Sequence, residues 1–265
     1  MNMCANNWRN TTDDANAHAY TYDMLYELTN VNYHDGNSTA YGYDKLGSRT
    51  SAAGLAYLRN NLNQYTSVGG TSYSYDNSGN LTNDGTYKYT YDCENRLAEV
   101  KDQNDAAIAS YKYDFSGRRV KKIVEGSPDV TTKYVYDGDR IIAEYDGSGN
   151  LLRKFIYGTG IDEPICMITA GGTRYYYHFD GLGSVAALSD NNGNIVEKYS
   201  YDVFGTPAIK GPSGEPRATS DVGNAYMFTG RAHDDETGNY YYRARYYKLC
   251  LLSVNGTTAG INLSL

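Results

Sequence analysis

The sequence contains no long apolar run, and its first residues include neither a basic stretch nor an apolar segment typical of a signal peptide. A membrane-spanning helix needs about 20 mostly apolar residues, so we expect no membrane span.

The sequence contains four cysteines that are far apart and include no C-x-x-C pair, Cys4, Cys93, Cys166 and Cys250. This spacing disfavours a disulfide framework or a zinc site, and we expect isolated thiols with no metal and no cofactor.

Large aromatic residues other than tyrosine are scarce, since 5 Phe and 1 Trp stand against 30 Tyr. A buried tyrosine brings a hydroxyl that needs a partner, so a core of this composition is expected to be apolar inside and hydrated at its margins.

Basic residues are outnumbered by acidic residues, which gives the chain a formal net charge of -7. An acidic surface repels phosphate backbones, which disfavours nucleic-acid binding.

Tyrosine recurs in front of aspartate at a fixed spacing. Asp44, Asp76 and Asp92 each follow a tyrosine, and Asn60 fills the gap, so that successive positions are 16 residues apart. A short fixed period indicates repeat architecture. Later Tyr-Asp pairs at wider or irregular intervals end at Asp114, Asp137, Asp146 and Asp202.

The residues around these pairs predict strands joined by tight turns. Residues 87–91 read YKYTY, which places three tyrosines on one face of a strand. A glycine or asparagine follows the aspartate three positions later, as in a type I turn that closes on a residue of positive φ. The predicted repeat turns are Asp44 with Gly47, Asp76 with Gly79, Asp92 with Asn95, Asp114 with Gly117, Asp146 with Gly149, and Asp202 with Gly205. Because the 16-residue register runs through residues 51–65, we predict strands and a turn there rather than a helix.

A distinctive block lies near the C-terminal end of the sequence, where residues 226–231 read YMFTGR and residues 234–247 read DDETGNYYYRARYY. This block closely resembles the repeat-associated core of RHS/YD-repeat proteins, which include bacterial polymorphic toxins, insecticidal toxin complexes and, more distantly, teneurins. Residues 177–184 and 199–205 resemble the segments that precede that core. The resemblance covers about residues 20–247. It implies an all-β fold in which an antiparallel YD-repeat sheet strip winds into a partial hollow shell, similar to a cocoon or solenoid.

This resemblance suggests a division of the chain. We expect an irregular segment at residues 1–19, a YD-repeat sheet array at 20–208, an exposed loop at 209–225, the core motif at 226–247 and a divergent tail at 248–265.

In many bacterial members of the family, an aspartyl autoprotease cuts just after the core, within a DPxxGRFL stretch. Here Tyr247 is followed by KLCLLS, so we expect no autoproteolysis. We interpret the chain as a truncated or frame-shifted gene copy, or as a fragment whose neighbouring sequence is encoded elsewhere.

Charged residues gather in the core motif, at Arg231, Asp234, Asp235, Glu236, Arg243 and Arg245. Neighbouring carboxylates can shift one another's pKa and serve acid/base catalysis. We favour a structural interpretation, in which Asp235 begins a turn that ends at Gly238 and its acidic neighbours are solvated. Arg243 and Arg245 would share one face of a strand and pair with those acids. We therefore predict no catalytic residue and no metal site.

These observations give three hypotheses. The first is a non-enzymatic shell segment of a bacterial RHS-type toxin or cell-surface protein, which encloses or presents a C-terminal effector. The second is a self-cleaving aspartyl protease core, and the third is a carbohydrate-binding or adhesion module. The expected partners are further YD repeats or a subunit that closes the shell, a C-terminal toxin and, on the third hypothesis, a glycan. We expect a secreted or cell-surface location.

Overall fold

The computed structural model describes residues 18–33 and 36–249. They form two compact units, one ending at Ser74 and the other beginning at Tyr75, whereas the repeat led us to expect one continuous array. The described residues are all-β apart from the short 3-10 helix η2 (Phe228–Gly230), which confirms the predicted fold class. None of their helices is long and apolar enough to cross a membrane.

The strands follow one another closely along the chain. Those of the first unit are β1 (Ala19–Tyr22), β2 (Leu28–Asn32), β3 (Ser38–Tyr43), β4 (Arg49–Ala52), β5 (Leu55–Arg59), β6 (Tyr65–Val68) and β7 (Thr71–Ser72). The boundary between the units falls within β8 (Ser74–Tyr75). The second unit continues with β9 (Leu81–Asn83), β10 (Tyr87–Tyr91), β11 (Leu97–Asp102), β12 (Ala107–Tyr113), β13 (Arg119–Val124), β14 (Val130–Asp137), β15 (Arg140–Asp146), β16 (Leu151–Tyr157), β17 (Pro164–Thr169), β18 (Arg174–Phe179), β19 (Val185–Ser189), β20 (Ile195–Tyr201), β21 (Pro207–Lys210), β22 (Pro216–Arg217), β23 (Ala232–Asp234), β24 (Asn239–Tyr241) and β25 (Tyr246–Lys248).

Strand order in every sheet follows chain order. In the described residues a 7-stranded sheet contains β1 to β7, a 15-stranded sheet contains β8 to β22, and a 3-stranded sheet contains β23 to β25. Neighbouring strands pair antiparallel, as the joining turns require. The prediction of strands over residues 51–65 is confirmed, because β4, β5 and β6 occupy this stretch.

One turn geometry recurs at the predicted repeat turns. At Asp114, the carboxylate accepts the backbone N–H groups of Ser116 and Arg118, each at 2.9 Å. The Gly117 N–H donates to the Asp114 carbonyl at 3.0 Å, and Gly117 has a φ of 77°. The backbone N–H of the fourth residue likewise donates to the carbonyl of Asp44, Asp76, Asp92, Asp146 and Asp202. Asparagine takes the positive-φ position at Asn63 and Asn95, with φ of 63° and 60°.

Three tyrosines that end strands of the second unit join their repeat to the one before it. The hydroxyl of Tyr113 donates to the carbonyl of Leu97 at 2.8 Å, and that of Tyr201 to Val185 at 2.7 Å, in each case 16 residues back. Tyr157 does the same to Ile141 at 3.0 Å. A hydrogen bond of this kind contributes about 1 kcal/mol to the stability of the fold. Neighbouring repeats are therefore joined by a lateral hydrogen bond as well as by the turns.

Alanine at Gly117 is expected to lower the free energy of unfolding by about 1–2 kcal/mol, because an L-residue is disfavoured at positive φ. The added methyl group would meet no atom within 4 Å, so the cost is one of backbone conformation alone. Alanine at Gly181, which also has open space and no positive φ, is the matched control and should be nearly neutral. Urea unfolding of the two variants measures the difference, and equal stabilities would refute this account of the turn.

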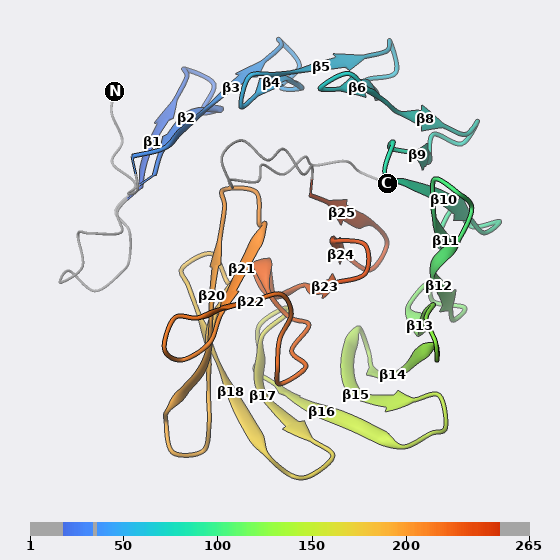
Figure 1. Cartoon of the computed structure of the whole chain (residues 1–265), viewed down its shortest axis with the longest axis vertical. Helices are drawn as coiled ribbons and strands as arrows, with labels where there is room; N and C mark the ends of the chain where they lie inside the picture. The colour runs from blue at the N-terminus through green and yellow to red at the C-terminus, as the bar shows by residue number, and fades with distance from the viewer. Residues whose placement is uncertain (1–17, 34–35, 250–265) are drawn as a thin grey trace. The chain divides into compact units, whose positions relative to one another are not determined.

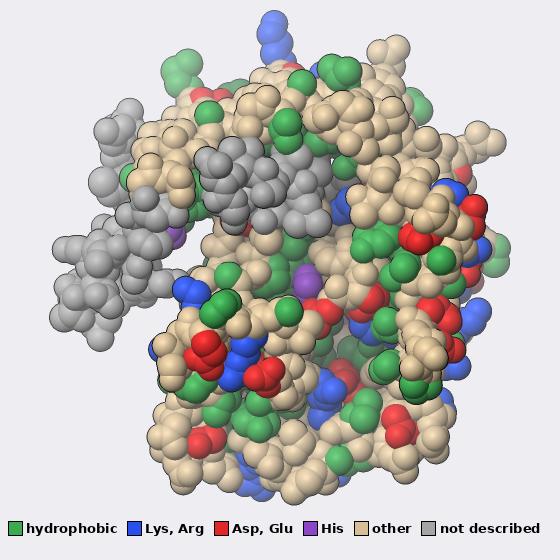
Figure 2. All heavy atoms as spheres, in the orientation of Figure 1, with side chains coloured by type: hydrophobic (Ala, Val, Ile, Leu, Met, Phe, Trp, Pro, Cys, Tyr) green, Lys and Arg blue, Asp and Glu red, His purple; other side chains and the backbone are tan. Residues whose placement is uncertain are grey.

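The second unit has its core between a curved sheet and a small inner one. Figure 1 shows the 15-stranded sheet bending around β23, β24 and β25, which lie on its concave side. Met167, Leu188, Met227 and Tyr240 are all fully buried in this core. In Figure 2, acidic and basic side chains lie beside hydrophobic ones in the recess next to the inner sheet. The core motif therefore packs inside the wall formed by the repeats.

The expected exposed loop at residues 209–225 is only partly a loop. Ile209 and Lys210 complete β21, and β22 follows within the stretch. Its later part is anchored by the fully buried Glu197 carboxylate, which accepts hydrogen bonds from the Ser220 hydroxyl and the Asp221 N–H, both at 2.7 Å. The sequence pattern missed this anchor because Glu197 lies in β20, far from the Gly- and Pro-rich residues.

Candidate functional site

The core motif is attached to the wall by a buried ion pair. Asp234, at the end of β23, accepts two hydrogen bonds from the guanidinium of Arg119, the first residue of β13, at 2.5 Å and 3.0 Å. Both side chains are 1% exposed. A bidentate pair of this geometry is among the strongest polar contacts in proteins. It joins residues that are 115 positions apart.

Tyrosines surround the Arg119 guanidinium. Its carbon lies 4.3 Å from the ring centre of Tyr241, 5.2 Å from that of Tyr111 and 5.3 Å from that of Tyr134. The hydroxyl of Tyr246 accepts a further hydrogen bond from Arg119 at 3.2 Å. Two of these rings belong to the wall and two to the inner sheet. The cation is thus held by ring faces from both layers, which compensates part of its lost hydration.

A lysine and a second carboxylate complete the network. Lys122 Nζ lies 2.9 Å from Asp234 Oδ1 and 3.1 Å from Glu236 Oε2. Tyr111 donates its hydroxyl to Glu236 at 3.3 Å. The cluster therefore sets two cations, Arg119 and Lys122, against two carboxylates, and its charges balance.

The two carboxylates have opposite pKa shifts. Burial acts to raise the pKa of Asp234, but the charges of Arg119 and Lys122 outweigh it and bring this pKa down to about 2. Burial, reinforced by the charge of Asp234, raises the pKa of Glu236 above its ordinary value of 4.5, against the opposing effect of Lys122. A pair of split pKa values is typical of acid/base catalysis. Here, however, the Asp234 carboxylate is enclosed and fully engaged by two cations.

The structure corrects our interpretation of the acidic run. The turn begins at Asp234 rather than Asp235, since the Asp234 carbonyl accepts the N–H of Gly238 at 2.8 Å. Asp234 and Glu236 are buried in the ion network and not solvated, because Arg119 and Lys122 of the wall pair with their carboxylates. Asp235 is the more exposed acid and accepts a hydrogen bond from the His233 ring at 2.7 Å.

The predicted pairing of Arg243 and Arg245 with these acids is also wrong. Both lie in the turn between β24 and β25, and Arg243 has a φ of 61°, so the alternation of a strand does not apply. Arg243 instead pairs with Asp162 at 2.6 Å, and Arg231 pairs with the other oxygen of the same carboxylate at 2.7 Å. Arg245 is exposed.

A second buried pair lies at the end of the inner sheet. Lys248 Nζ contacts the Asp84 carboxylate, which also accepts the hydroxyl of Tyr89 at 2.5 Å. Burial acts to raise the pKa of Asp84, but the charge of Lys248 outweighs it and leaves the pKa below its ordinary value. We had assigned Lys248 to the divergent tail, yet it is the last residue of β25 and is buried.

Sequence reasoning missed Arg119, Lys122, Asp84 and Asp162. One signal was available for Arg119, which follows the turn aspartate Asp114 by five positions. Four other repeats have an apolar residue at this position, Leu81, Leu97, Leu151 or Val185, whereas the repeat of Asp44 has Arg49 there. A charged residue at a position that is apolar in most of these repeats predicts a buried partner, although not which one.

The pKa of Glu236 predicts a pH dependence. Because this pKa is higher in the folded protein than in the unfolded chain, folding binds a proton as the pH falls through it, and the wild type gains stability there. The wild type should therefore become more stable relative to Glu236→Gln as the pH falls from neutral toward the ordinary value of 4.5. Urea unfolding at a series of pH values over this range measures the difference. A constant or decreasing difference would contradict the raised pKa.

No group of three or more His, Cys, Asp and Glu side chains placed to hold a metal ion occurs within residues 18–33 and 36–249. Of the four cysteines, Cys93 is exposed and Cys166 is buried, and both are free thiols. The other two, Cys4 and Cys250, lie outside the described residues.

Comparison with known proteins identifies relatives of the repeats. A model of the teneurin YD-shell family matches residues 2–210 and ends before the core motif. The tRNA3(Ser)-specific nuclease WapA of Bacillus spizizenii is 35% identical over 228 residues, covering 86% of this chain and 8% of the relative. The tRNA nuclease WapA of Bacillus subtilis is 36% identical over the same length and coverage. This chain thus spans 8% of the length of these curated relatives.

Solved structures share the fold at lower sequence identity. The crystal structure of TcdB2-TccC3 aligns with a TM-score of 0.57 and 17% identity, covering 87% of this chain and 14% of that one. A Tc holotoxin pore from Photorhabdus luminescens aligns with a TM-score of 0.56 and 17% identity, with coverages of 87% and 13%. At this level of identity the likeness extends to the fold alone.

Proposed function

Because the chain belongs to the teneurin YD-shell family, we propose that it is a structural segment of an RHS-type toxin shell, with its core motif fixed against the inner face of the wall. Membership confirms the resemblance of its repeats to RHS/YD-repeat proteins. The observation that carries the proposal is the buried contact between Arg119 and Asp234. A carboxylate enclosed in this way binds the layers together and has no access to a substrate.

In this proposal the chain itself is not an enzyme, and the effector lies outside the stretch it shares with its relatives. The relatives are named as tRNA nucleases, but the match spans only 8% of their length. The net charge of -7 is also unfavourable for holding tRNA. Containment or presentation of a C-terminal effector is the role that a curved wall with an inner core motif would serve. Because it would contain or present an effector, we also propose that the chain is secreted or located at the cell surface.

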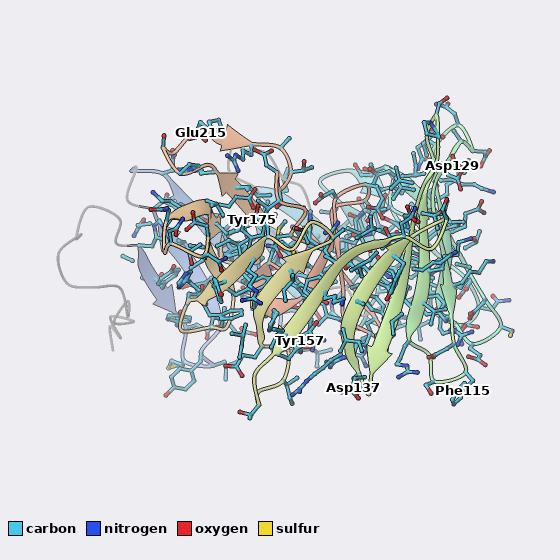
Figure 3. All side chains as sticks on the ribbon, turned by 90° about the horizontal axis from the view of Figure 1, so that it is seen from below. Phe115, Asp129, Asp137, Tyr157, Tyr175 and Glu215 are labelled. Atoms are coloured by element: carbon cyan, nitrogen blue, oxygen red, sulfur yellow. The ribbon has the colours of Figure 1, made fainter. Side chains whose placement is uncertain are left out.

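The two rims of the second unit differ, which supports a partner on one of them. Figure 3 places Phe115 and Asp137 at one rim and Asp129 and Glu215 at the other. Turns of the first rim carry Phe115, Ile161 and Leu182, which are 96%, 82% and 65% exposed. We propose that further YD repeats or a closing subunit cover this rim, since burying exposed apolar side chains is thermodynamically favourable.

Intact-mass spectrometry of the purified chain tests the structural role against self-cleavage. A single uncut species is expected, because the chain lacks the Asp-Pro sequence after Tyr247 and engages Asp234 with two cations. Time-dependent appearance of a fragment cut near Tyr247, in the presence of protease inhibitors, would instead support the protease hypothesis.

The carbohydrate-binding hypothesis has less support. Stacking on a sugar needs an exposed aromatic face, whereas four tyrosines of the repeat strands, Tyr89, Tyr111, Tyr177 and Tyr199, are each less than a tenth exposed. A glycan array with the purified chain would decide the matter, and specific binding would restore this hypothesis.

A further inference from the structure

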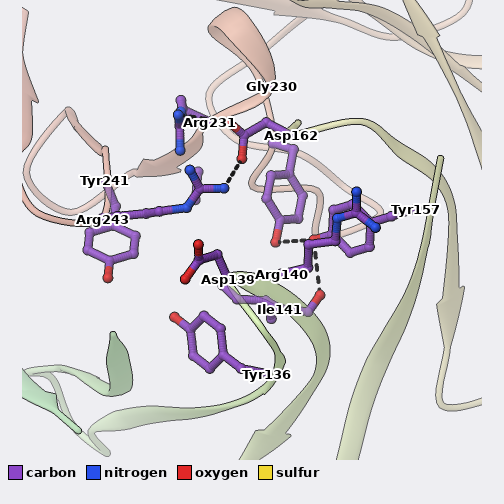
Figure 4. A pocket seen from close by; sticks show the side chains of 12 residues that line it. Tyr136, Asp139, Arg140, Ile141, Tyr157, Asp162, Gly230, Arg231, Tyr241 and Arg243 are labelled. Carbon is purple, nitrogen blue, oxygen red and sulfur yellow. Dashed lines mark hydrogen bonds and ion pairs between the residues drawn. The ribbon is translucent and has the colours of Figure 1, made fainter. Parts of the chain in front are cut away.

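A pocket in the second unit brings three arginines together. It lies between the turn that joins β14 to β15, the loop that joins β16 to β17, and the core motif (Figure 4). Its charged lining consists of Asp139, Arg140, Asp162, Arg231 and Arg243. None of these residues belongs to the ion network around Arg119, and the structural role proposed above does not require the pocket.

The pocket contains more arginines than acidic residues that pair with them. Asp162 gives one oxygen to Arg243 at 2.6 Å and the other to Arg231 at 2.7 Å. Arg140 donates to the carbonyls of Thr159 and Gly160, at 3.4 Å and 3.0 Å, rather than to an acid. The Asp139 carboxylate makes no ion pair with any residue that the structure describes.

The balance of charge in the pocket is therefore positive. Three guanidiniums face two carboxylates, an excess of one positive charge, whereas the network around Arg119 holds two cations and two carboxylates. Burial lowers the pKa of Arg231, an effect that Asp162 opposes and the neighbouring charge of Arg243 reinforces. Like charges held in a partly buried site cost free energy, which a bound anion would offset.

The backbone holds this cluster in an unusual conformation. Asp162 and Arg243 have φ of 56° and 61°, values that are uncommon for residues other than glycine. Gly230 lies against them with a φ of 68°, and a Cβ atom at this position would come within 2.3 Å of the Asp162 carbonyl oxygen. Such conformations cost about 1–3 kcal/mol each and concentrate at ligand sites, where they fix the groups that bind.

From the charge excess, the strained backbone and the placement of the arginines in the pocket, we propose that it binds an oxyanion, either a carboxylate or a phosphate group, between Arg231 and Arg243. A guanidinium has five N–H donors in a planar fork, and each of these two arginines uses one nitrogen for Asp162. The remaining donors suit two oxygens of one anion. The occupant would be an acidic side chain or chain end, or a phosphorylated group.

Isothermal titration calorimetry of the full chain tests the site, with inorganic phosphate and N-acetylglutamate as probes at constant ionic strength. Saturable binding is expected to weaken by at least about tenfold in Arg243→Gln. Arg245→Gln is the matched control and should bind as the wild type does, because Arg245 is exposed and does not line the pocket. The tighter probe identifies the source of the oxyanion.

Asp139→Asn keeps the test valid if the arginine variant fails to fold. Asp139 is exposed and holds no ion pair with the described residues, so its replacement should leave the fold intact while removing a negative charge from the pocket. Binding should then tighten several-fold. Absence of saturable binding of both probes to the wild type would overturn the proposal, as would unchanged affinity in Asp139→Asn or in folded Arg243→Gln.

Discussion

Replacing Asp234 with alanine is expected to lower the free energy of unfolding by about 3–5 kcal/mol, since it leaves the buried Arg119 without its counter-charge and removes one of the two carboxylates that pair with Lys122. Arg119 is 1% exposed and Lys122 is 15% exposed, so neither side chain can regain its hydration without opening the contact between wall and inner sheet. The substitution is therefore expected to destabilise the wall and the inner sheet together. For the same reason the expected effect exceeds that of a surface ion pair, which contributes about 0–1 kcal/mol.

Asp235→Ala is the matched control for this prediction. Asp235 is the adjacent acid, is 44% exposed and contacts only the His233 ring through its carboxylate among the described residues. Its replacement should change the free energy of unfolding by about 0.5 kcal/mol or less. Urea unfolding followed by circular dichroism compares the two variants. Similar effects for Asp234→Ala and Asp235→Ala would mean that the buried pair does not secure the core motif.

Replacing Tyr240 with alanine is the second change for which we expect a large effect, about 3–5 kcal/mol. Tyr240 lies in the middle strand of the inner sheet and is fully buried. Its ring centre lies 4.9 Å from that of His233 and 6.3 Å from that of Phe228, and its hydroxyl donates to the Gly205 carbonyl at 2.9 Å. Alanine would leave a cavity between the inner sheet and the turn that ends at Gly205.

Tyr240→Phe separates packing from hydrogen bonding at this position. It retains the ring and removes only the hydroxyl, leaving the Gly205 carbonyl without that donor. A cost of about 1–2 kcal/mol is expected. Chemical unfolding of both variants gives the two contributions. If alanine cost no more than phenylalanine, the inner sheet would not form the core of the second unit.

Local chemistry accounts for the parts of the fold that the sequence predicts. Asp114 and Gly117 define their turn within four residues, and the alternation of YKYTY defines a strand within five. Because each turn joins neighbouring strands, sheet order follows chain order. The division into two units at residue 74 is not predicted, since the 16-residue register passes through it unchanged.

The site depends on contacts between distant residues, and the sequence carries little information about them. Asp234 and Arg119 are 115 residues apart, and Asp84 and Lys248 are 164 apart. No repeat register links either pair. The acidic run misled us because Asp235 and Gly238 have the spacing of a repeat turn, while tertiary burial of Asp234 shifts the turn by one residue. For Arg243, strand alternation fails because the residue occupies a turn.

The most direct test of the account is a double-mutant cycle between Arg119 and Asp234. The free energy of unfolding would be measured for the wild type, Arg119→Met, Asp234→Asn and the double variant. If the pair fixes the core motif against the wall, the coupling energy should be about 2 kcal/mol or more, because each single variant leaves a buried charge that the double variant removes. A coupling energy near zero would contradict the account.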